Sequence, residues 1–137
     1  MIRILLIEDD ERRYTKFKEW LPEAFHVVWA KNAGAALGIL ERLQPGDYAG
    51  ILLDHDLEKR TMTDDGAHFN GGHVVDALLK RRPTERDIPI LVHSMNANRG
   101  PGMAHRLAEA GYPVTRVRMA ELCRERFLEW LEELREE

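Results

Sequence analysis

The chain has 137 residues, of which 44% are hydrophobic and 32% charged, and its formal net charge is −4 at pH 7. These values predict one globular domain over residues 1–137 and exclude a disordered or fibrous chain. The acidic balance, with both signs interspersed, argues against binding DNA through a basic face.

Five short apolar runs alternate with five segments in which apolar residues recur at helical spacing. The runs are continuously apolar, which is typical of strands buried on both faces, and proline or glycine closes most of the helical segments. In chain order, the predicted strands are 2–7, 26–30, 50–53, 89–92 and 114–117, and the predicted helices are 11–21, 32–43, 74–79, 103–110 and 120–134.

Strands that alternate with amphipathic helices predict a parallel α/β sheet covered by helices on both faces. Right-handed crossovers leave few topologies for such a chain. In these sheets, ligands bind beyond the carboxyl ends of the strands, near the point where the strand order reverses. We therefore look for functional residues directly after the predicted strands, at Ile7, Leu53, Val92 and Val117.

Acidic residues follow the first and third predicted strands. Carboxylates that converge from neighbouring strands repel one another, and a hard divalent cation with oxygen ligands relieves this repulsion. We expect Asp9 and Asp54 to bind magnesium or manganese directly, with Glu8 as an outer partner in the same metal site. Asp10 and Glu11 are instead expected to stabilise the start of a helix, where negative charge is favourable.

The residues Ile-Leu-Leu-Ile-Glu-Asp-Asp-Glu at 4–11 resemble the opening of CheY-like receiver domains, whose acid pair holds magnesium. Residues 51–54 resemble the receiver strand that ends in the phospho-accepting aspartate, here Asp54. The resemblance places Asp56 where a backbone carbonyl completes the metal shell. It implies a doubly wound (βα)5 domain of the flavodoxin/CheY type, with a parallel five-stranded sheet of order 2-1-3-4-5.

Residues 89–94 resemble the fourth receiver strand, with Ser94 at the position of the hydroxyl that contacts the phosphoryl group. The fifth strand departs from the receiver pattern. Receivers carry a lysine there, usually followed by proline, whereas Arg116 is nearest to that place in this chain and arginine does not replace the compact ammonium group conservatively. The aromatic residue of the receiver strand is also absent, since Val117 or Arg118 stands near its position. These departures argue against the ordinary phosphorylation switch.

Two segments resemble a divergent branch of the superfamily, the cyclic-phosphate-processing receiver domains. They are Leu-Asp-His-Asp-Leu at 53–57 and His-Ser-Met-Asn-Ala-Asn-Arg at 93–99. The two motifs together are fairly specific, whereas either alone is a weak signal. The resemblance implies hydrolysis of a cyclic phosphate on a small, nucleotide-like ligand.

Opening a cyclic phosphodiester requires a base that activates water and an acid that protonates the leaving alkoxide. Histidine suits both roles near neutral pH. The expected catalytic residues are Asp54, His55 and His93. The expected phosphate-binding residues are Ser94, Asn96, Arg99 and Arg116.

Three functions compete for this sequence. The first is a metal-assisted cyclic phosphodiesterase, and we rank it slightly above the second, a phosphorelay receiver in which Asp54 accepts a phosphoryl group from a histidine kinase. The third is a degenerate receiver that serves as a scaffold, with the apolar last helix as a homodimer face.

The location of the protein is expected to be the cytoplasm, without membrane contact. No segment reaches the about 18 consecutive apolar residues of a membrane-spanning helix, and the apolar start is too short for a secretory signal. The single cysteine, Cys123, excludes an internal disulfide and a cysteine-cluster zinc site. Its place on the apolar face of the last predicted helix indicates a core residue.

Overall fold

The computed structural model describes residues 2–54, 61–62, 68–69, 71–94, 100–118 and 122–135. Five parallel strands form its main sheet, in the spatial order β2-β1-β3-β6-β7. These strands are β1 (Ile2–Ile7), β2 (Phe25–Ala30), β3 (Gly50–Asp54), β6 (Ile90–Ser94) and β7 (Val114–Arg118). Numbered among themselves they give the order 2-1-3-4-5, which confirms the predicted doubly wound fold.

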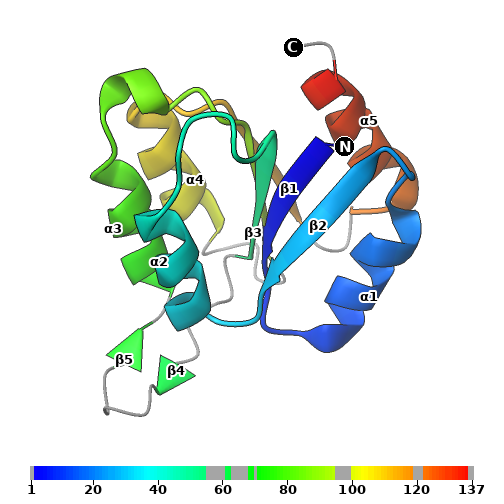
Figure 1. Cartoon of the computed structure of the whole chain (residues 1–137), viewed down its shortest axis with the longest axis horizontal. Helices are drawn as coiled ribbons and strands as arrows, with labels where there is room; N and C mark the ends of the chain where they lie inside the picture. Colours follow the sequence, from blue (N-terminus) through cyan, green and yellow to red (C-terminus); the bar gives the residue numbers. More distant parts are fainter. Residues whose placement is uncertain are drawn as a thin grey trace.

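Helices cover both faces of this sheet (Figure 1). One face carries α1 (Glu11–Trp20) and α5 (Arg124–Arg135), and the other carries α2 (Ala33–Glu41), α3 (Gly71–Leu79) and α4 (Gly100–Glu109). A short 3₁₀ helix, η1 (Pro83–Glu85), precedes β6. Two short antiparallel strands, β4 (Thr61–Met62) and β5 (His68–Phe69), lie in the polar stretch after β3, where the sequence shows no strand signal.

Successive side chains of each strand supply two separate cores, because strand residues alternate between the faces of a sheet. The core beneath α2, α3 and α4, here the α2–α4 core, is largely aliphatic and includes Leu5, Leu53, Val74, Leu78 and Val92. The core beneath α1 and α5, here the α1/α5 core, is richer in aromatic residues and includes Phe17, Phe25, Phe127 and Trp130.

Helix boundaries follow the capping signals of the sequence. The Asp10 carboxylate accepts hydrogen bonds from the backbone N–H groups of Arg12 and Arg13, at 2.8 and 3.1 Å. Asn32 caps α2 in the same way, by accepting from the N–H of Ala35 at 2.8 Å. After α4 the chain turns at Gly111, whose φ of +107° favours glycine.

The last helix packs directly on the sheet. Gly50 permits this approach, because a Cβ atom there would lie 2.8 Å from the ring of Trp130. The apolar face of α5 is therefore used in the core, so it does not form the homodimer surface that the scaffold hypothesis needs. The prediction that Cys123 is a core residue is wrong, because α5 begins one residue later and leaves this side chain exposed. Within the described ranges, no helix is long and apolar enough to cross a membrane.

Candidate metal and phosphate site

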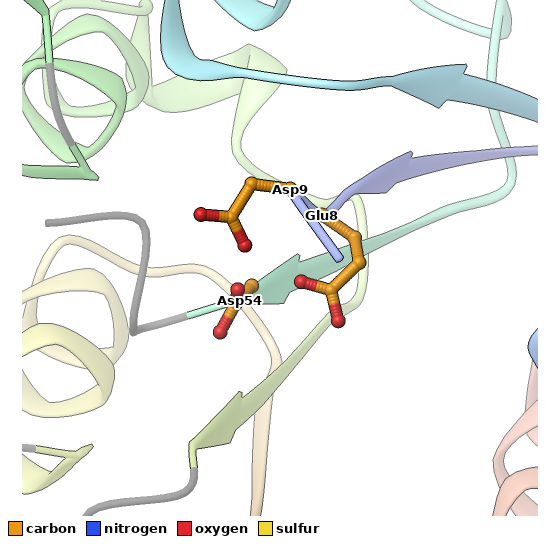
Figure 2. Close-up of side chains that lie close together, drawn as sticks. All are labelled: Glu8, Asp9 and Asp54. Carbon is orange, nitrogen blue, oxygen red and sulfur yellow. The ribbon is translucent and has the colours of Figure 1, made fainter. Parts of the chain in front are cut away.

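Three carboxylates meet at the carboxyl edge of the sheet. Glu8 and Asp9 follow β1 and Asp54 ends β3, and one carboxylate oxygen from each lies within 4.8 Å of the others (Figure 2). The side chains of Glu8 and Asp54 are 0% and 1% exposed, whereas that of Asp9 is 26% exposed. The expected convergence of these acids is therefore present, with one acid open to solvent and two enclosed.

Glu8 and Asp54 belong to a transverse row of buried ionisable side chains that also includes His93. Asp54 is the register partner of His93. On β1, Ile7 pairs with Leu53 of β3, so the following residue, Glu8, lies beside Asp54. Two residues before the members of the row lie leucines of the α1/α5 core: Leu6, Leu52 and Leu91. The row thus continues that core to the sheet edge, and among described residues it holds all the buried acidic or basic side chains.

Arg13, from the first turn of α1, covers the acidic end of this row. Its guanidinium pairs with Glu8 through Nε and through Nη2, which lies 3.3 Å from Oε2. The same Nη2 lies 3.4 Å from Asp54 Oδ2 and 3.7 Å from Asp9 Oδ1. Burial by itself would lower the pKa of Arg13. The hydrogen bond and charge of Glu8, together with the charge of Asp54, outweigh this effect, so the pKa lies above its ordinary, already high value. The guanidinium therefore stays charged.

Arg13 was not among the site residues predicted from the sequence. The available signal was its spacing, because a residue in the first turns of a helix lies over the strand end that leads into it. Arg13 lies four positions after Asp9, and the two form an ion pair across that connection. A basic residue placed one turn after an acid pair is thus a candidate counter-ion for that pair.

His93 lies beneath α1, where the Phe17 ring packs against its imidazole at a centroid distance of 5.3 Å. The side chain is 1% exposed, and its Nε2 atom has no hydrogen-bond partner among the residues that the structure describes. Desolvation, with a smaller contribution from the positive charge of Arg13, lowers the pKa of His93 to about 3. The imidazole is therefore neutral at pH 7 and has no surface through which a substrate could exchange a proton. This burial argues against the expected role of His93 as an acid or base.

The other predicted site residues are placed only in part. His55, Asp56, Asn96 and Arg99 lie outside the described residues. Ser94 ends β6, and its register partner on β7 is Arg118. Arg116 is exposed and pairs with Val92, two residues before the strand end. Arg118, rather than Arg116, is therefore the fifth-strand arginine at the edge where the acids lie.

A stacked pair of aromatic rings holds the connection between β1 and α1. Tyr14 of α1 and Trp29 of β2 stack at 3.9 Å with an interplanar angle of 6°. The indole Nε1 donates a hydrogen bond to the backbone carbonyl of Glu8 at 2.8 Å. This contact ties the end of β1 to the edge strand, so the backbone that presents Glu8 and Asp9 is fixed from both sides.

The donor set suits a divalent cation. Three carboxylates carry three negative charges and Arg13 one positive charge, which leaves a charge of −2 on the cluster. Oxygen donors are the ligands that magnesium and manganese prefer, and magnesium is commonly held by one or two carboxylates together with water and phosphate. Asp9, the exposed acid, and Asp54 are the residues that could hold such an ion.

A family model described as the cyclic-phosphate processing receiver domain matches residues 4–109 of the chain. No curated protein is significantly similar in sequence. Among solved structures, the receiver domain of sensor histidine kinase PA1611 from Pseudomonas aeruginosa, with magnesium coordinated in its active-site cleft, matches with a TM-score of 0.69 at 20% identity. That match covers 97% of this chain and 96% of the other.

Two further receiver structures are similar over nearly their whole length. The non-phosphorylated HemR receiver domain from Leptospira biflexa is 27% identical with a TM-score of 0.69, and the match covers 98% of this chain and 94% of that one. A CheY-like response regulator receiver domain protein from Methanospirillum hungatei is 21% identical with a TM-score of 0.70, covering 99% and 95%. These similarities confirm the predicted CheY-like fold.

Proposed function

The chain belongs to the family of cyclic-phosphate processing receiver domains, and from this premise we propose that it hydrolyses a cyclic phosphate on a small, nucleotide-like ligand with the help of a divalent cation. The observation that carries the proposal is the convergence of three carboxylates, with a remaining charge of −2, at the edge of the sheet where such folds bind ligands. Asp9 and Asp54 hold the cation in this proposal, and Glu8 holds Arg13 beside it.

A bound divalent cation would offset the negative charge that develops on the phosphate and would lower the pKa of a coordinated water. Proton transfer to the leaving alkoxide needs an accessible group, which the buried His93 does not offer. We assign this role to His55, which directly follows Asp54 in the chain. Ser94, Asn96 and Arg99 remain the proposed phosphate-binding residues, and we add Arg118 to Arg116 as the fifth-strand candidate.

The test is hydrolysis of 2′,3′-cyclic nucleotides, followed by separation of products, with and without magnesium. Replacement of a general acid or base is expected to lower the rate by on the order of 10²–10⁴-fold, so His55→Ala should lose most activity. Asp54→Asn should lose the magnesium-dependent hydrolysis. The variant His26→Ala is the matched control, because His26 is exposed on β2 at the other end of its strand. Absence of turnover by the wild type with magnesium would refute the hydrolase proposal.

A second function is supported by Asp54 itself. It ends β3 beside Glu8 and Asp9, in a fold shared with receiver domains of histidine kinase signalling. As a phosphorelay receiver in signal transduction, the domain would accept a phosphoryl group on Asp54 from a histidine kinase in the cytoplasm. Incubation with acetyl phosphate and magnesium, followed by intact mass measurement, would show one added phosphoryl group in the wild type and none in Asp54→Asn. An unmodified wild type with magnesium bound would exclude this function.

A further inference from the structure

We propose that Arg13 is an internal counter-ion of the metal site, which rests on the carboxylates when no divalent cation is bound and releases Asp54 and Asp9 when one binds. The inference rests on the divalent-cation site of the proposed function. Its consequence is that the affinity for the cation is set by Arg13 as well as by the acids, although this side chain is not itself a ligand.

The contacts of Arg13 are unequal. Glu8 accepts hydrogen bonds from two nitrogens of the guanidinium, Nε and Nη2. Asp54 and Asp9 contact only Nη2, at 3.4 and 3.7 Å. Charge-assisted hydrogen bonds are normally about 2.7–2.9 Å long. The pairing with Glu8 is therefore the anchor of the guanidinium, and the two longer contacts can be given up while the Nε contact persists.

The position of Arg13 makes this movement local. Its backbone N–H is fixed by the Asp10 carboxylate at 3.1 Å, and its side chain is 18% exposed. A rotation of the end of the guanidinium away from Asp54 thus requires no displacement of α1. Glu8, at 0% exposure, has no accessible route to another partner, so it keeps the arginine beside the site in both states.

The charges at the site give the direction of the effect. A cation at Asp9 and Asp54 would lie near the positive charge that Glu8 retains beside the site. This charge opposes cation binding, and the enclosed position of Asp54 limits the screening by salt. Like charges a few ångströms apart near a protein surface change affinity by on the order of tenfold or more. Glu8 is at the same time saturated by Arg13, which leaves two carboxylates for the metal.

The test is calorimetric titration of magnesium into the wild type and Arg13→Gln. Removal of the competing charge is expected to raise the magnesium affinity by about tenfold. The matched control is Arg12→Gln, which removes the same charge from the neighbouring, exposed position of α1. Its affinity should stay within about twofold of the wild type, since exposed charges are screened. An affinity of Arg13→Gln equal to or below that of the wild type would overturn the proposal.

A second pair of variants guards against misfolding, because Arg13→Gln leaves the Glu8 carboxylate buried and unpaired. The double variant Glu8→Gln/Arg13→Gln removes both partners, and its reference is Glu8→Gln alone. In that single variant the guanidinium has lost its anchor and can lie fully on Asp54 and Asp9. We expect the double variant to bind magnesium more tightly than Glu8→Gln, and an equal or weaker affinity would contradict the counter-ion role.

Thermal unfolding supplies a readout that needs no substrate. Saturating magnesium should raise the unfolding temperature of Arg13→Gln more than that of the wild type, because tighter binding to the folded state stabilises it more. Asp54→Asn separates the two ways of failing. Magnesium binding that is lost in Asp54→Asn but unchanged in Arg13→Gln overturns the counter-ion role alone, whereas no binding in any variant overturns the proposed metal site and the counter-ion role together.

Discussion

The two faces of the sheet are built from alternate residues of the same strands, yet they end differently at the carboxyl edge. The α2–α4 core is aliphatic along β1, β3 and β6. The α1/α5 core, with its aromatic residues, passes into the ionisable row Glu8, Asp54 and His93. The core on the first face consists of apolar side chains and the Tyr112 ring. Packing on the second face also sets the charge state of residues beside the site.

The difference arises from α1. Arg13 and Phe17, four residues apart on this helix, lie on the same helix face, so the first covers the acids and the second covers His93. One helix therefore supplies a counter-ion to one end of the row and an apolar lid to the other. A buried charge without a partner is costly. The ionised acids of the row therefore need the counter-ion, and the imidazole beneath an apolar side chain stays neutral.

The sharpest test of this contrast compares Phe17→Ala with Leu78→Ala. Both side chains are buried, Phe17 in the α1/α5 core and Leu78 in the α2–α4 core. Each truncation should lower the free energy of unfolding, by about 3–5 kcal/mol for Phe17→Ala and about 2–5 kcal/mol for Leu78→Ala, measured by denaturant titration. Only Phe17→Ala should also raise the pKa of His93 towards its ordinary value, because water then reaches the imidazole. NMR titration of the His93 ring gives that pKa, and equal values in the two variants would break the contrast.

A smaller effect is expected from pH. The pKa of His93 is about 3 in the folded chain against an ordinary value of 6.5, so below pH 6.5 the unfolded chain binds a proton that the folded chain excludes. The contribution of the neutral imidazole to stability is therefore complete above this value and falls as the pH decreases towards 3. Between pH 6.5 and 5 the wild type should lose about 1–2 kcal/mol more than His93→Leu.

The matched control for this experiment is His26→Leu, a loss of an exposed histidine from β2. The contrast between the two variants shows whether the change in pH dependence is specific to the buried imidazole. If His93→Leu behaves like His26→Leu, the imidazole is not held neutral by the fold and the second face has lost its distinguishing feature.

The smallest predicted effect lies on the α2–α4 side. The buried Tyr112 hydroxyl donates a hydrogen bond to the backbone carbonyl of Leu78 at 2.6 Å. Tyr112→Phe should cost about 1 kcal/mol in the free energy of unfolding. It should leave magnesium affinity unchanged, because no ionisable residue of the row contacts this face. A change in magnesium affinity would show that the two faces are coupled through the sheet.

The fold and the edge at which the acids gather could be predicted from the sequence alone. Continuous apolar strands and periodic helices are local patterns, and they specify a parallel sheet because only that arrangement buries both kinds of segment. The positions of Asp9 and Asp54 at strand ends then place their carboxylates together. Capping by Asp10 and Asn32 could likewise be predicted, since a cap bonds to residues two or three positions away.

What lies over those acids depends instead on tertiary packing. Arg13 faces Glu8 because of the way α1 packs on the sheet. His93 is enclosed because the Phe17 ring of the same helix packs against it. The sequence of β6 predicts that successive side chains point to opposite faces of the sheet. Which of these faces water can reach depends on the helices that pack on them. Burial and long-range pairing depend on segments that are distant in the chain. Ionisable residues that look alike in the sequence, because each lies at a strand end, therefore differ in the structure. The acids are paired with a cation, whereas the imidazole is enclosed by an apolar ring.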